Sequence, residues 1–90
     1  MNESQYDIGI HETRASDLPE NTNPTREEVK ELLQQVEGLR CTTPINMILD
    51  NVRKAADSPE PWAPSDQTRL CYRAIYGCLS AYKRNKGKQT

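Results

Sequence analysis

Hydrophobic residues recur at helical spacing in three stretches of the chain, and each stretch predicts a helix. Within residues 25–37 and 44–57 the apolar positions are Val29, Leu32, Leu33, Val36, Ile45, Ile48, Leu49 and Val52. This i, i+3, i+4, i+7 spacing places the apolar side chains on one face of each helix. Three such faces bury one another most simply in an up-down bundle, so we predict an all-α fold with three helices.

Local capping signals define the ends of the first two helices. Thr25 with Glu28 three residues later predicts a capping box, which satisfies two backbone N–H groups at the helix start. Gly38 is suited to the left-handed conformation that ends a helix. Thr43 as a cap and Pro44 at the first helical position begin the second helix.

The segment 58–64 predicts a stiff linker, because it holds three prolines in seven residues. Trp62 lies in its middle. We expect its large apolar ring to fold back onto the helices as a lid. The alternative is an exposed Trp that anchors a partner. Ser65 then caps the third helix.

The third apolar stretch, residues 65–85, predicts a helix with two different faces. At 3.6 residues per turn one side is apolar and carries Leu70, Cys71, Ala74, Ile75, Cys78, Leu79, Ala81 and Tyr82. The opposite side, called here the Arg/Tyr stripe, carries Arg69, Tyr72, Arg73, Tyr76, Ser80, Lys83 and Arg84. We expect the apolar side in the core and the Arg/Tyr stripe in solvent.

Residues 1–24 predict a disordered acidic tail. They hold five acidic residues and one arginine, and such a segment buries too little apolar surface to offset its ordering entropy. Tyr6, Ile8 and Ile10 alternate as in a strand and would dock on the domain or on a partner. The folded domain is then 25–85, followed by a basic tail, 86–90.

Charge is divided unevenly along the chain, although the formal net charge is only −1. Residues 1–65 carry 12 acidic and 6 basic side chains, giving −6, and residues 66–90 carry 1 acidic and 6 basic, giving +5. Such a split is typical of an interaction surface. With 34% hydrophobic residues and no Phe the core is thin, so we expect stability near the low end of about 5–15 kcal/mol.

The residues that support catalysis or metal binding are sparse. The single histidine, His11, lies in the acidic tail, and Cys41, Cys71 and Cys78 are far apart in the sequence. A zinc site needs about four Cys, His or acidic ligands at close spacing. No phosphate-binding loop, dinucleotide fingerprint or nucleophile elbow is present. We therefore expect no metal, no cofactor, no catalytic residue and no enzymatic activity.

The cysteines and the hydropathy pattern indicate a compartment. Cys71 and Cys78 are seven residues apart on one predicted helix, about 10 Å along its axis, beyond the ~7 Å Cα limit for a disulfide. The sequence shows no signal peptide and no long apolar run. We expect reduced thiols in an intracellular, cytoplasmic protein that does not insert into membranes.

The Arg/Tyr stripe carries the functional prediction. Tyr and Arg are enriched in binding hot spots because each combines contact area with hydrogen bonding. We predict a small regulatory module that binds a partner protein through Arg69, Tyr72, Arg73, Tyr76, Lys83 and Arg84. The structural alternative is that these cations complement the helix dipole or pair within the chain, as Arg69 would with Asp66.

Two further readings stay open. The basic end could bind nucleic acid, with Arg53, Lys54, Lys86 and Lys88 as candidate phosphate contacts, although a sequence pI of about 5.8 is low for such a protein. A homodimer would set the acidic first helix of one copy against the basic third helix of another.

Overall fold

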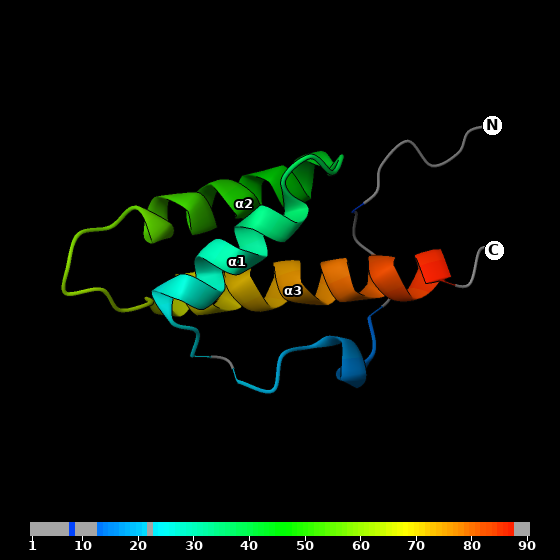
Figure 1. Ribbon diagram of the computed structural model, residues 1–90, viewed down its shortest axis with the longest axis horizontal. Coiled ribbons are helices and arrows are strands. Elements are labelled where there is room, and N and C mark those ends of the chain that lie inside the picture. Colours follow the sequence, from blue (N-terminus) through cyan, green and yellow to red (C-terminus); the bar gives the residue numbers. More distant parts are fainter. Residues whose placement is uncertain (1–7, 9–12, 22, 88–90) are drawn as a thin grey trace.

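The computed structural model describes residues 8, 13–21 and 23–87, and it confirms an all-α fold with three packed helices (Figure 1). Helix α1 spans Arg26–Val36, α2 spans Thr43–Ala56 and α3 spans Asp66–Gly87. Successive helices run antiparallel, and α1 crosses the other two diagonally (Figure 1). A short 3-10 helix, η1, spans Ala15–Asp17 and lies against the second half of α3.

The capping signals of α1 are confirmed. The Thr25 hydroxyl accepts a hydrogen bond from the Glu28 amide at 3.1 Å, and the Glu28 carboxylate accepts one from the Thr25 amide at 2.8 Å. Gly38 follows the helix with φ of +88°, a conformation that side chains with a Cβ rarely adopt. Helix α2 begins one residue earlier than predicted, with Thr42 as its N-cap and Pro44 at its second position.

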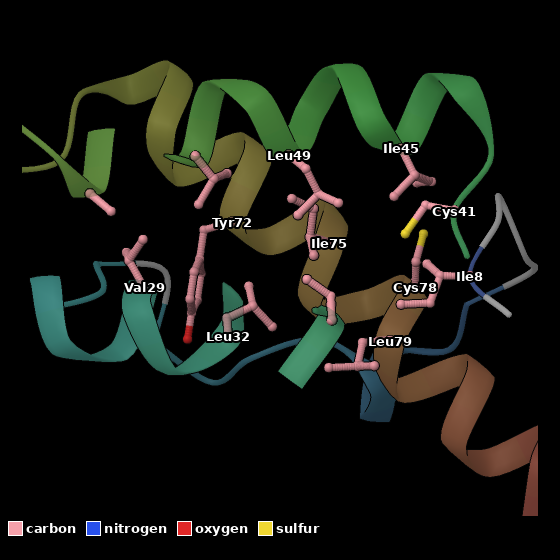
Figure 2. Packing of buried hydrophobic residues seen from close by; sticks show 13 residues of the cluster. Ile8, Val29, Leu32, Cys41, Ile45, Leu49, Tyr72, Ile75, Cys78 and Leu79 are labelled. Carbon is pink, nitrogen blue, oxygen red and sulfur yellow. The ribbon is translucent and has the colours of Figure 1, made fainter. Parts of the chain in front are cut away.

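A single hydrophobic core joins the three helices (Figure 2). Its buried members are Ile8, Val29, Leu32, Val36, Cys41, Ile45, Leu49, Val52, Ala56, Tyr72, Ile75, Cys78 and Leu79. The predicted apolar stripes of α1 and α2 therefore lie inside, with Leu33 and Ile48 half-buried at the edge.

The predicted orientation of α3 is wrong in its first half. Tyr72, assigned to the exposed stripe, is only 6% exposed, whereas Leu70, assigned to the core, is 69% exposed. Ile75, Cys78, Leu79 and Ala81 are buried as expected. Tyr72 thus points from α3 toward α1 (Figure 2), and Leu70 lies on the solvent side of the helix.

The N-terminal segment packs on the domain at its described residues, which differs from the expected tail. Ile8 is fully buried and forms a parallel bridge with Cys41, with hydrogen bonds of 2.9 Å to the Arg40 carbonyl and 3.0 Å from the Thr42 amide. Of the two predicted alternatives for this patch, Ile8 docks on the domain. Tyr6 and Ile10 lie outside the described residues.

Gly77 on α3 lies against Thr13 and Leu18 of the N-terminal segment. A Cβ placed on Gly77 would lie 2.9 Å from Cδ2 of Leu18 and 3.6 Å from Cγ2 of Thr13. Ala81, one turn further along, is fully buried. The absence of a side chain at Gly77 therefore lets the N-terminal segment lie close to α3.

The lid interpretation of Trp62 is confirmed. Its indole N–H donates a 2.7 Å hydrogen bond to the Ala55 carbonyl at the end of α2, and its ring packs half-buried against the core. Arg26 supports the same turn, because its guanidinium bonds the Ala56 carbonyl at 2.9 Å and the Glu60 carboxylate at 2.7 Å. The linker is thus held against both α1 and α2.

Candidate functional site

The structure divides the predicted partner-binding residues among different environments. Arg73 and Lys83 are exposed, Arg69, Tyr76 and Arg84 are half-buried, and Tyr72 is buried. They do not form one continuous exposed stripe. The expectation of a single Arg/Tyr surface is therefore corrected, and the residues separate into the three groups described below.

Arg84 belongs to an ion pair that holds the N-terminal segment. Its guanidinium contacts the Asp17 carboxylate through two nitrogens, at 2.8 and 3.2 Å, and Asp17 also accepts a 2.8 Å hydrogen bond from the Arg14 amide. Asp17 is only 5% exposed. The bonds from Arg84 and Arg14 lower the pKa of Asp17, so its carboxylate stays charged at neutral pH.

The second group surrounds Leu70 on the exposed side of α3. Asp66, Arg69, Leu70 and Arg73 line a shallow depression of about 360 Å³. Arg69 pairs with Asp66 one turn earlier, as the structural alternative anticipated. Arg73 forms no ion pair with any described residue. This Leu70 surface thus combines an exposed apolar side chain with an unpaired cation.

The third group lines a groove of about 340 Å³ between α1 and α3. Tyr72, Tyr76, Ser80 and Lys83 contribute from α3, and Glu28, Glu31, Leu32 and Gln35 contribute from α1. The rings of Tyr72 and Tyr76 are tilted by 46° with centroids 5.9 Å apart. Lys83 donates a 2.7 Å hydrogen bond to the Gln35 side chain across the groove.

Electrostatics in the α1–α3 groove are negative at the end near Tyr72. Burial raises the pKa of Tyr72, and the charges of Glu28 and Glu31 together with the neighbouring Tyr76 raise it further. The phenol therefore stays protonated at neutral pH. Sequence reasoning missed this groove because it depends on how α1 packs against α3.

The candidate nucleic-acid contacts do not converge. Arg53 and Lys54 lie in the last turn of α2, whose end contacts Trp62 just before α3 begins. Lys86 lies in the last turn of α3, with its ammonium 5.7 Å from the Tyr82 ring centre. A helix of 22 residues is about 33 Å long, so these cations stand at opposite ends of the bundle (Figure 1). Lys88 lies outside the described residues.

The three cysteines differ in how deeply they are buried. Cys41 and Cys78 are buried and Cys71 is half-exposed, all as free thiols. Burial raises the pKa of the Cys71 thiol, and a hydrogen bond with Asn51 opposes that shift. Over residues 8, 13–21 and 23–87, no three His, Cys, Asp or Glu side chains are grouped as metal ligands. No helix in that part of the chain is both long and apolar enough to cross a bilayer.

Comparisons with known proteins give no relative: no protein-family model, no curated protein and no solved structure matches the chain.

Proposed function

We propose that this protein is a non-enzymatic binding module that contacts a partner protein through the Leu70 surface. The observation that carries the proposal is the exposure of Leu70, 69%, on a helix whose other aliphatic side chains of similar size, Ile75 and Leu79, are buried. An exposed leucine side chain forgoes the roughly 1.5–3 kcal/mol of free energy that its full burial would contribute. That energy becomes available when a partner covers the side chain.

The partner should present an apolar side chain beside acidic groups. Arg69 and Arg73 flank Leu70, and residues 66–90, which contain them, carry a net charge of +5. Arginines next to an apolar centre provide the planar donors that pair with carboxylates. An acidic segment with one leucine-sized side chain therefore complements this surface.

Met47 on α2 provides the matched control, because it is 66% exposed and thus nearly equal to Leu70. Its helical neighbours are Thr43, Asp50 and Asn51, which offer no cation. Charge complementarity therefore favours the Leu70 surface over the Met47 surface.

The experiment compares capture of proteins from a nuclease-treated lysate of the native host by three immobilised proteins. They are the unaltered protein, the double variant Leu70→Asp/Arg73→Glu, and the control Met47→Asp. We expect a defined protein that the unaltered protein and the control retain and the double variant loses. That protein, purified, should bind directly with the same dependence. Equal capture by all three, or capture that occurs only from a parallel lysate without nuclease, contradicts the proposal.

A further inference from the structure

The groove between α1 and α3 is lined by Tyr72, whose hydroxyl bonds none of the described residues. Tyr72 is 94% buried, and its ring extends from α3 toward Val29 and Leu32 of α1 with the hydroxyl at its far end (Figure 2). The hydroxyl of a tyrosine whose ring is buried normally bonds a protein group or water. This one opens into the groove, where a ligand can bond it.

The α1 side of the groove supplies negative charge. Glu28 uses one carboxylate oxygen to cap α1 and keeps the other available. Glu31, one turn of α1 away on the same wall, is exposed and forms no ion pair with any described residue. Burial is the main cause of the raised pKa of Tyr72, and the charges of Glu28 and Glu31 raise it further. A bound anion would be repelled here, whereas a cation would be attracted.

The α3 side of the groove supplies aromatic faces. Tyr72 and Tyr76 stand 5.9 Å apart with their rings tilted by 46°. Tyrosine faces attract cations through the ring quadrupole, and this attraction is stronger for a weakly hydrated, planar cation that can also stack. The single cation of the groove, Lys83, is held at the other end by Gln35.

We propose that this groove binds the guanidinium group of an arginine side chain on a partner protein. A guanidinium offers five N–H donors in one plane. It stacks on Tyr76, pairs with the Glu31 carboxylate, and donates to the Tyr72 hydroxyl oxygen. The volume of about 340 Å³ accepts the whole side chain. A lysine ammonium supplies the positive charge, but it cannot stack on a ring as a planar group does and lacks the forked N–H donors of a guanidinium. The inference is independent of the Leu70 surface, and different residues test it.

The probe is a short, capped tripeptide, Gly-Arg-Gly, added to the full-length, isotopically labelled protein. Amide chemical shifts are followed beside titrations with two matched peptides, one with citrulline and one with lysine in place of arginine. We expect saturable shifts centred on Glu28, Glu31, Tyr72 and Tyr76. Citrulline, which keeps the shape and loses the charge, should bind at least about tenfold more weakly, a difference of about 1.4 kcal/mol. Lysine should fall between the two.

Two variants and one control identify the groups involved. Tyr72→Phe removes a hydroxyl that bonds none of the described residues, so the urea midpoint should not fall while the arginine peptide binds several-fold more weakly. Glu31→Gln should weaken binding similarly, and Glu37→Gln, exposed at the end of α1 outside the groove, should not. The inference is overturned if arginine and citrulline peptides shift the same amides equally. It is also overturned if Tyr72→Phe and Glu31→Gln bind the arginine peptide as tightly as the unaltered protein.

Discussion

The orientation of α3 is tested most sharply by truncating Tyr72 and Leu70 to alanine in parallel. Tyr72 is 6% exposed within the core, and Leu70 is 69% exposed. Removing a buried aromatic ring costs about 3–5 kcal/mol. We expect about 3 kcal/mol for Tyr72→Ala, because the hydroxyl end opens into the groove and alanine regains a few tenths in helix propensity. Leu70→Ala should change stability by less than about 0.5 kcal/mol, as surface substitutions usually do.

Urea unfolding followed by far-ultraviolet circular dichroism measures both variants. With a slope of about 1.5 kcal/mol per M, Tyr72→Ala should lower the midpoint by about 2 M and Leu70→Ala by less than about 0.4 M. For a domain of this size, total stability is about 5–10 kcal/mol, so the loss is large but measurable. Comparable losses for both variants, or a larger loss for Leu70→Ala, would refute the assignment of inner and outer faces.

Three further outcomes follow from the contacts of α3. The pKa of Asp17 lies below its ordinary value, so its contact with Arg84 is complete above about pH 4 and is lost only as the pH falls through that lowered pKa. The amide chemical shifts of η1 should change over that pH range, and Asp17→Asn should abolish the change. Gly77→Leu should displace Leu18 and raise proteolysis of residues 13–18 while the helical signal persists, and unchanged proteolysis would contradict the packing. Iodoacetamide at pH 8 should modify Cys71 first, more slowly than a free cysteine because its pKa is raised; faster labelling of either other cysteine would contradict the burial pattern.

Local signals predicted the helices well, because each depends on residues that are close in sequence. The Thr25–Glu28 capping box and the left-handed Gly38 are short-range arrangements, and both are present. The lid of Trp62 was also predictable, since a large ring in a short linker has only the adjacent helices to cover. Helix ends in the structure differ from the predicted ones by at most two residues.

The face of α3 could not be set from the sequence, because two partners compete for it. Leu70 is more hydrophobic than Tyr72. A helical projection that assigns Ala74 and Ala81 to the core therefore places the buried face on the side of Leu70. In the structure Gly77, which lies between these two alanines, packs against Leu18 and Thr13. The glycine was a signal, since it permits close approach, but its partner Leu18 lies about 60 positions away in the sequence.

The candidate sites illustrate the same limit. The Asp17–Arg84 pair joins residues 67 positions apart, so Arg84 looked available in the sequence and is engaged in the fold. The groove proposed to bind arginine forms only because α1 and α3 are adjacent, and no sequence motif predicts that adjacency. Arg73 and Lys83 are the exposed cations of the predicted stripe. Lys83 donates a hydrogen bond to Gln35, whereas Arg73 forms no ion pair with any described residue.

Nuclear Overhauser contacts of the Tyr72 ring report which way α3 faces, on which both proposed surfaces depend. We expect strong contacts from the Tyr72 ring protons to the Leu32 methyl groups, and none from the Leu70 methyl groups to any residue of α1. Contacts of Leu70 with α1 or α2, together with a Tyr72 ring that touches neither helix, would contradict this orientation of α3.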